Sequence, residues 1–280
     1  MATASLLSPH DVSTTLNYYA PLDDSTELPY FYAWPQAERP RTNVGSEPHP
    51  VVVHDARGHE DEYTLDDSGF QFVKWPSKET TFDDDERIKN EYYTETEELL
   101  NKVTGAKRVL IFDHTIRRRK PDDPGEETPE NRGPAERVHV DQTYEASVKR
   151  VKDHLPDEAD RLLKSRVRII NVWRPIQNPV AHHPLAVSDW RSFDQRDLVP
   201  TRLIHPHREG ALFGVRYNPK HRWYYLSDQT PDEVTLIKCY DSEEDKARLT
   251  PHTAFLDHTA PKDAPHRQSI EIRALVFDGE

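Results

Sequence analysis

The sequence contains 15 histidines and 50 aspartates and glutamates among its 280 residues, and a few of these side chains could hold a metal ion. Two histidines and one carboxylate bind a divalent metal on one face and leave its other positions open. Two of these three ligands commonly stand as His-x-Asp or His-x-Glu. That pattern occurs at His59–Asp61, His139–Asp141 and His207–Glu209. Composition alone predicts about 2.7 matches, so the pattern by itself does not choose between the three pairs.

Local context favours the pair His139–Asp141. These two residues alternate with Val138 and Val140, and residues i and i+2 of a β-strand point to the same side. The pair is therefore expected to point inward at the end of a strand. The other two pairs lie in a charged turn and in a loop with proline and glycine, which is typical of solvated surface. A hydrogen-bonded core histidine is the alternative interpretation of His139.

The third ligand is expected on a later strand, where His252 begins the segment His-Thr-Ala-Phe. Further along, Arg267 and Ser269 share one face of a predicted strand, and a fixed arginine beside a hydroxyl binds a carboxylate through paired hydrogen bonds. Arg273 lies on the same face, and an ion pair with Glu271 or a surface acid is its favoured role. Together these residues indicate an Fe(II) site that uses a 2-oxo acid.

Two further residues are candidates for contact with 2-oxoglutarate or with substrate. Asn171 and Trp173 point inward if Val172 faces the packing layer. The alternative is that Trp173 only fills the core while Asn171 is hydrogen-bonded to a loop.

The elements that must position these residues are mainly strands. Hydrophobic periodicity predicts helices over 83–104, 144–154 and 157–164, and strands over 50–54, 61–66, 69–75 and 107–114. After residue 165 almost every segment reads as strand: 166–173, 184–190, 197–204, 211–217, 222–227, 233–240, 252–256 and 267–277. Prolines at 21, 29, 35, 40, 48 and 50 predict an irregular first fifty residues, and a turn at 218–220 predicts a hairpin. Strands without alternating helices favour an antiparallel barrel or jelly roll with flanking helices.

From Lys107 to Phe277 the chain resembles the fungal hydroxylase/desaturase group that includes the gibberellin desaturase and the cephem methoxylase component. The motifs that show this resemblance are Asn171-Val-Trp-Arg-Pro175, Pro184-Leu-Ala-Val-Ser-Asp189, His221-Arg-Trp-Tyr-Tyr-Leu-Ser-Asp-Gln229, Thr230-Pro-Asp-Glu-Val234, Lys238-Cys-Tyr-Asp-Ser242, Thr250-Pro-His-Thr-Ala-Phe255 and the strand 267–277.

The resemblance implies a double-stranded β-helix fold and an Fe(II)/2-oxoglutarate-dependent oxygenase of fungal secondary metabolism, which hydroxylates or desaturates a small molecule with O2. His139, Asp141, His252 and Arg267 match the positions that the family expects. We therefore expect residues 106–280 to form a double-stranded β-helix catalytic core. Residues 1–105 are expected to form an N-terminal extension with short strands and a helix, packed on that core within a single domain.

Composition disfavours other partners. The net charge of −13 and the pI near 5.6 oppose binding to nucleic acid or to an anionic membrane. The single cysteine, Cys239, excludes an internal disulfide and a cysteine-cluster metal site. A cytoplasmic enzyme with a small-molecule substrate is the resulting expectation. A homodimer is compatible with it.

Two other classes of function stay open on the residues alone. A zinc-dependent hydrolase could use the same two histidines and carboxylate, because zinc accepts that ligand set. It would have no need of the Arg267 clamp. A non-catalytic β-barrel binding module is the third possibility, and its ligand binding would survive replacement of His139.

Overall fold

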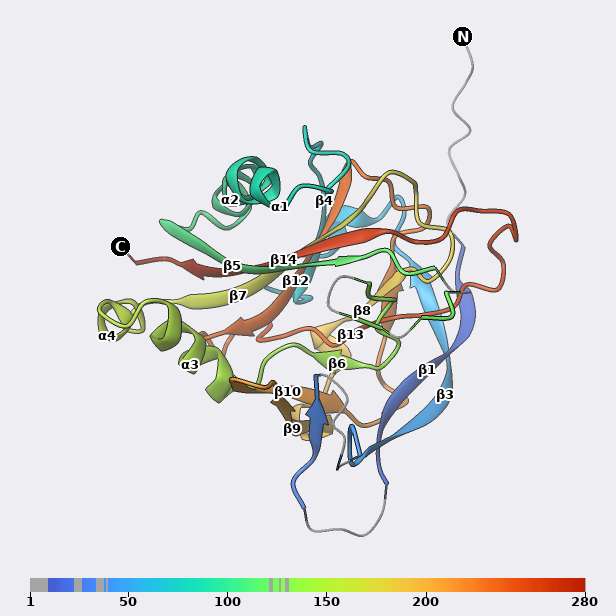
Figure 1. Ribbon diagram of the computed structural model, residues 1–280, viewed down its shortest axis with the longest axis horizontal. Coiled ribbons are helices and arrows are strands. Elements are labelled where there is room, and N and C mark those ends of the chain that lie inside the picture. The colour runs from blue at the N-terminus through green and yellow to red at the C-terminus, as the bar shows by residue number, and fades with distance from the viewer. Residues whose placement is uncertain are drawn as a thin grey trace.

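The computed structural model describes residues 10–22, 27–33, 38, 40–120, 123–125, 127–128 and 131–279. In that part of the chain, two curled sheets face each other across a shared interior (Figure 1). Side chains from both sheets meet there, including Ile237, Val187 and Phe213. Most neighbouring strands are antiparallel. The mainly β, jelly-roll architecture with flanking helices that the sequence predicts is therefore confirmed.

The smaller sheet has five strands in a wholly antiparallel order. In spatial order they are β4 (Phe70–Lys74), β12 (Glu233–Asp241), β7 (Val167–Pro175), β14 (Ser269–Phe277) and β5 (Arg108–Arg117). Its central strands are buried on both faces, so they lack the alternation of a half-exposed strand. Ile170 and Val172 pack with Leu99 on the outer face, whereas Trp173 points into the interior. Val172 thus faces the packing layer, as predicted.

Helices cover the outer face of this sheet and one end of the interior (Figure 1). The predicted helix over 83–104 is confirmed as α1 (Asp85–Arg87), a π-helical turn at Ile88–Tyr92 and α2 (Tyr93–Thr104). Asp84 caps its start through the amides of Glu86 and Arg87, and Gly105 at φ 66° ends it. The other two helices are α3 (Tyr144–His154) and α4 (Ala159–Leu162), the latter shorter than the predicted 157–164.

The larger sheet has nine strands and contains His139 and His252, while Asp141 directly follows its strand β6. In spatial order they are β1 (Val12–Pro21), β3 (Val44–Asp55), β11 (Trp223–Tyr225), β8 (Leu185–Ser188), β13 (His252–Ala254), β6 (His139–Val140), β10 (Glu209–Val215), β9 (Leu198–Ile204) and β2 (Tyr30–Tyr32). Strand β6 is only two residues long and lies between β10 and β13. Short 3₁₀ turns at Trp190–Ser192 and Gln195–Asp197 connect β8 to β9.

The prediction of an irregular first fifty residues is wrong where strands are present, at Val12–Pro21, Tyr30–Tyr32 and Val44–Asp55. Residues 1–9, 23–26, 34–37 and 39 lie outside the described residues. Strands β1 and β3 pair antiparallel over ten residues, from Val12–Val53 to Pro21–Val44. Prolines 48 and 50 are tolerated because β3 has a second neighbour, β11, only at Val53–Asp55. At Pro48 and Pro50 this second edge of β3 has no neighbouring strand, so no backbone amide donor is needed there. Proline content alone could not show which edge of the strand stays unpaired.

Two other local predictions are wrong. Residues 61–66 form no strand, and Glu60–Glu62 is a 3₁₀ turn instead. The turn at 218–220 does not close a hairpin, because β10 pairs with β9 and β6 while β11 pairs with β3 and β8. The chain crosses the sheet there. The division of the chain near residue 105 stays a prediction.

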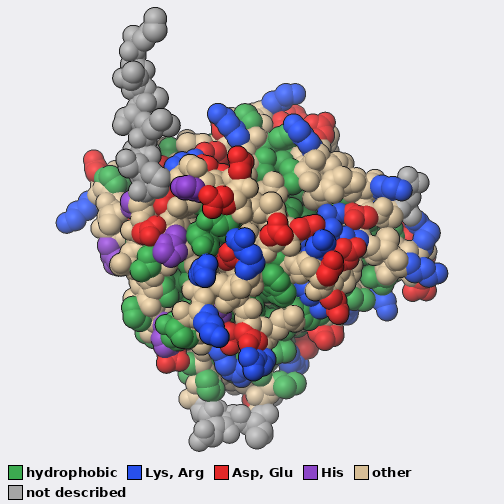
Figure 2. Space-filling model, turned by 180° about the vertical axis from the view of Figure 1, so that it is seen from behind, with side chains coloured by type: hydrophobic (Ala, Val, Ile, Leu, Met, Phe, Trp, Pro, Cys, Tyr) green, Lys and Arg blue, Asp and Glu red, His purple; other side chains and the backbone are tan. Residues whose placement is uncertain are grey.

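On the face of the molecule shown in Figure 2, acidic and basic side chains are interspersed. No helix in the described ranges is long and apolar enough to cross a membrane.

Candidate metal centre

The fold brings His139, Asp141 and His252 together. One nitrogen or oxygen atom from each side chain lies within 4.8 Å of the others. His139 on β6 is the register partner of His252 on β13, and the two rings lie 4.5 Å apart between centroids. Asp141 follows β6 directly. Among the described residues, these three side chains are the group of histidines and carboxylates that lie close enough together to hold a metal ion.

Backbone carbonyls orient both histidines. Nδ1 of His139 lies 2.7 Å from the carbonyl oxygen of Arg137, and Nδ1 of His252 lies 3.0 Å from that of Thr250. Since a carbonyl only accepts hydrogen bonds, each Nδ1 must carry the proton. In the neutral ring, the form that binds a metal, Nε2 then keeps its lone pair. Nε2 of His139 lies 3.4 Å from Oδ1 of Asp141. This is the arrangement that metal-bound histidines need.

Two side chains hold the carboxylate of Asp141. Its Oδ2 accepts hydrogen bonds from Nδ2 of Asn171 at 2.7 Å and from Nε of Arg273 at 2.9 Å. Although burial alone would raise it, the charge of Arg273 and the contact with His139 hold the pKa of Asp141 well below its usual range. The carboxylate is therefore ionised, as a metal ligand must be.

The sequence interpretation missed the contact between Arg273 and Asp141. The predicted ion pair of Arg273 with Glu271 is present at 2.5 Å, but Nε of the same guanidinium reaches Asp141. Arg273 lies opposite Asn171 in the β14–β7 register, so one position of the sheet supplies both donors. Only the pairing of these strands could reveal this.

Arg267 lies in a small cavity of about 30 Å³ that the three candidate ligands also line. The side chain is 7% exposed, and its Nη1 donates to the carbonyl of His183 at 2.8 Å. The guanidinium carbon lies 5.3 Å from the ring centroid of Trp173. Burial, with the nearby charge of Arg117, lowers the pKa of Arg267 to about 9.

Among the described residues, no carboxylate lies within ion-pair distance of Arg267, and its buried Nε has no hydrogen-bond partner. A buried cation in this state needs an anion. The side chain is thus suited to a carboxylate such as that of a 2-oxo acid. Ser269, the second residue of the predicted clamp, is buried two positions further on at the start of β14.

Neither rival pair contributes a ligand atom to this cluster. Asp61 is exposed in a 3₁₀ turn, and the exposed His59 contacts Glu62 at 2.8 Å. Glu209 is exposed and pairs with Arg202 at 2.6 Å. Both pairs therefore have the surface environment that their sequence context predicted.

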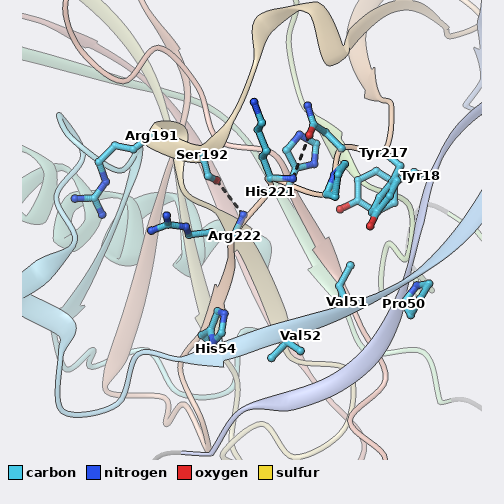
Figure 3. Close-up of a pocket in the computed structure, with 13 residues that line it drawn as sticks. Tyr18, Pro50, Val51, Val52, His54, Arg191, Ser192, Tyr217, His221 and Arg222 are labelled. Atoms are coloured by element: carbon cyan, nitrogen blue, oxygen red, sulfur yellow. Dashed lines mark hydrogen bonds between the residues drawn. The ribbon is translucent and has the colours of Figure 1, made fainter.

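Two larger cavities differ in their distance from the cluster. One of about 500 Å³ is lined by Asp141 and Arg273 together with residues of β5, α3 and the β9–β10 turn. A second, of about 660 Å³, lies between β3 and the segment 217–222 and is lined by Tyr18, His54 and Arg222 (Figure 3). None of the candidate metal ligands lines the second cavity. Only the first connects to the metal-binding side chains.

A jelly roll with two histidines, one aspartate and a buried arginine in a common cavity defines the class of non-haem metal-dependent oxygenases that use a 2-oxo acid. Comparisons with known proteins agree. A family profile described as "Oxidoreductase/YMDC permease-like domain" matches residues 16–277. The chain is 36% identical over 296 residues to the hydroxylase/desaturase efuI of Hormonema carpetanum, covering 98% of this chain and 97% of that protein.

Similarity extends to a protein whose structure is solved. The Fe(II)/2-oxoglutarate-dependent dioxygenase nvfI of Aspergillus novofumigatus is 34% identical over 261 residues, with 89% of this chain and 91% of the relative covered. A solved structure of the iron and alpha-ketoglutarate-dependent endoperoxidase NvfI superposes with a TM-score of 0.87 at 32% identity, over 98% of this chain and 99% of that one.

The chain therefore belongs to the fungal hydroxylase/desaturase family of Fe(II)/2-oxoglutarate-dependent dioxygenases. It is an oxidoreductase of fungal secondary metabolism that uses Fe(II), 2-oxoglutarate and O2. Membership in this family favours the oxygenase over the zinc hydrolase and the binding module that the residues alone left open.

Proposed function

We propose that His139, Asp141 and His252 hold the Fe(II) ion of this oxygenase. The observation that supports this most strongly is the clustering of their ligand atoms within 4.8 Å of one another. Both histidines are fixed by carbonyls, and the carboxylate is kept ionised by Arg273. When bound, the iron and 2-oxoglutarate together activate O2 for removal of hydrogen from a substrate.

Arg267 and Ser269 are the proposed contacts of the far carboxylate of 2-oxoglutarate. Arg267 brings a buried positive charge that lacks a carboxylate partner in the described structure. The ring of Trp173 forms one wall of the same cavity and supports the guanidinium from one side. These residues would neutralise the charge of the far carboxylate, orient the cosubstrate and shield it from water.

Asn171 and Trp173 remain the proposed contacts of substrate or cosubstrate. Trp173 is the better placed of the two, because it lines the cavity that the ligands share. The amide of Asn171 is occupied by Asp141, while its buried Oδ1 has no hydrogen-bond partner among the described residues. That oxygen is available to a donor on a bound molecule.

The proposed reaction is hydroxylation or desaturation of a small-molecule natural product. A cytoplasmic site of action, favoured by the single cysteine of the chain, belongs to the same proposal. So do a possible homodimer and the absence of nucleic acid and membrane partners, the latter favoured by the net charge of −13.

The test is an anaerobic absorption spectrum of the full chain with Fe(II) and 2-oxoglutarate. We expect a visible charge-transfer band that Asp141→Ala abolishes, because that variant loses a ligand. Asp61→Ala, which removes an exposed carboxylate from a rival pair, should keep the band and turnover. Loss of the band from Asp61→Ala, with Asp141→Ala unaffected, would place the metal elsewhere.

A further inference from the structure

The cavity of about 500 Å³ beside Asp141 has a mixed lining. Strand β5, helix α3, the β9–β10 turn and the segment that precedes β6 form its walls. Phe112, Leu203 and Ala146 provide apolar surface, and several arginines, among them Arg150 and Arg208, provide positive charge. Such a cavity suits an organic molecule that has both a hydrocarbon part and a charged group.

The acidic side chains of this cavity already have basic partners. Asp153 contacts Lys149 at 2.6 Å, and Glu209 contacts Arg202 at 2.6 Å. Asp113 lies 3.6 Å from Arg273, the same side chain that binds Asp141. The negative charges therefore do not neutralise the remaining arginines.

Arg150 and Arg208 are two of the arginines that line the cavity. Neither forms an ion pair with a carboxylate in the described part of the chain. Arg150 instead lies over the ring of Phe112, with its guanidinium carbon 5.1 Å from the ring centroid. Burial lowers the pKa of Arg150, and repulsion from Arg208 lowers it further. Two cations that repel each other beside an apolar wall are stabilised by a shared anion.

The nearby histidines His205 and His154 do not change this balance of charge. Burial and the charge of Arg208 lower the pKa of His205, and burial with the charge of Arg150 lowers the pKa of His154. Both rings are therefore neutral at pH 7. The cavity keeps its excess of positive charge.

We infer that this cavity binds the substrate and that the substrate is an organic carboxylic acid, held by Arg150 and Arg208 through its carboxylate. Its hydrocarbon part would lie against Phe112 and extend toward Asp141. This inference deepens the proposed function and rests on it, because Asp141 joins the cavity to the proposed iron site.

The other basic cavity serves as an internal control. Arg191 and Arg222 lie at its edge (Figure 3), but Arg191 is already paired with Asp189 at 2.7 Å. Because no candidate metal ligand lines that cavity, an acid bound there could not reach the iron. Arg222→Gln therefore removes the same charge from a basic cavity of no consequence to the reaction.

The experiment is a calorimetric titration of the full chain loaded with Fe(II) and saturating 2-oxoglutarate, under anaerobic conditions. The probes are decanoic acid, 2-naphthoic acid and cholic acid, each paired with its methyl ester. We expect at least one acid to bind with a dissociation constant below about 1 mM, and at least about tenfold more tightly than its ester. Arg208→Gln, an exposed change that should not impair folding, and Arg150→Gln should each remove most of that difference. Arg222→Gln should not.

Four outcomes would overturn the inference. They are equal binding of acids and esters, unchanged binding in both Arg150→Gln and Arg208→Gln, no saturable binding by any acid, and acid binding that appears only when 2-oxoglutarate is left out. The last would assign the cavity to the cosubstrate. The charge-transfer band of the same samples tests the proposed function separately, so its absence alongside selective acid binding would identify which of the two ideas fails.

Discussion

Among single residues, Arg267, two positions before β14, and Arg273, within β14, have different tasks. Arg267 is buried beside the proposed iron ligands without a carboxylate partner in the described chain. Arg273 is saturated by Asp141, Glu271 and Thr115. The first is therefore free to bind a ligand, whereas the second positions Asp141.

These tasks predict separable effects on kinetics. Breaking a desolvated pair between a guanidinium and a carboxylate costs about 2–5 kcal/mol. Arg267→Ala should therefore raise the KM for 2-oxoglutarate by roughly 30-fold to several thousand-fold. Arg267→Lys should fall in between, because lysine keeps the charge but loses the planar pair of donors. Retention of iron should change little in either variant.

Arg273→Ala is the matched comparison. It should weaken retention of Fe(II), because Asp141 loses the donor that orients its carboxylate, and it should move the KM for 2-oxoglutarate less than about tenfold. Steady-state kinetics and iron content after desalting measure both quantities. A larger KM effect for Arg273→Ala than for Arg267→Ala would assign the clamp to Arg273.

At the scale of elements, the antiparallel pair of β1 and β3 joins the larger sheet through aromatic side chains. The indole Nε1 of Trp223 on β11 donates to the hydroxyl of Tyr18 on β1 at 2.8 Å. Both side chains are fully buried. The hydrogen bond therefore links an element before residue 22 to one after residue 222, inside a common apolar cluster.

Tyr18→Phe should lower the free energy of unfolding by about 1–3 kcal/mol, because it leaves the buried indole N–H of Trp223 without an acceptor. Tyr19→Phe on the same strand is the control. No hydrogen bond of the Tyr19 hydroxyl occurs among the described residues, so we expect a change within about 0.5 kcal/mol. Urea denaturation followed by circular dichroism measures both. Equal effects would show that the hydrogen bond contributes nothing specific.

At the scale of the whole molecule, a buried ionic network ties the segment before β4 to the smaller sheet. Lys238 and Asp241 on β12 are fully buried and lie 2.6 Å apart. Arg166 lies 2.6 Å from both Asp241 and Asp66. Burial would raise the pKa of Asp66, but the hydrogen bond from Arg166 and the charge of Lys238 lower it from 3.8 to about 2.

A lowered pKa in the folded state makes this network sensitive to acid. The contribution of Asp66 to stability is present above its ordinary pKa of 3.8 and is lost as pH falls from there through about 2. The difference in unfolding free energy between the wild type and Asp66→Asn should therefore shrink over that range. The difference for Tyr18→Phe should stay constant, because no charge is removed. A constant Asp66→Asn difference would contradict the shift.

Residue types and their spacing along the chain are enough to predict the chemistry of this protein. Ligand types, their place on predicted strands and the Arg267–Ser269 strand indicated an iron site that uses a 2-oxo acid, and ordered motifs indicated the family. Periodicity also predicted α2 and the strands of the smaller sheet, since those patterns depend on nearest neighbours along the chain.

Only the tertiary structure decided which side chains surround the ligands and which strands pair. The donors Asn171 and Arg273 meet at Asp141 because β7 and β14 pair in one register. The β1–β3 pair tolerates prolines 48 and 50 because the other edge of β3 pairs with β11 only at Val53–Asp55. The positive cavity arises because α3, β5 and the β9–β10 turn converge. Each of these facts depends on contacts between residues far apart in the sequence, and local patterns do not record such contacts.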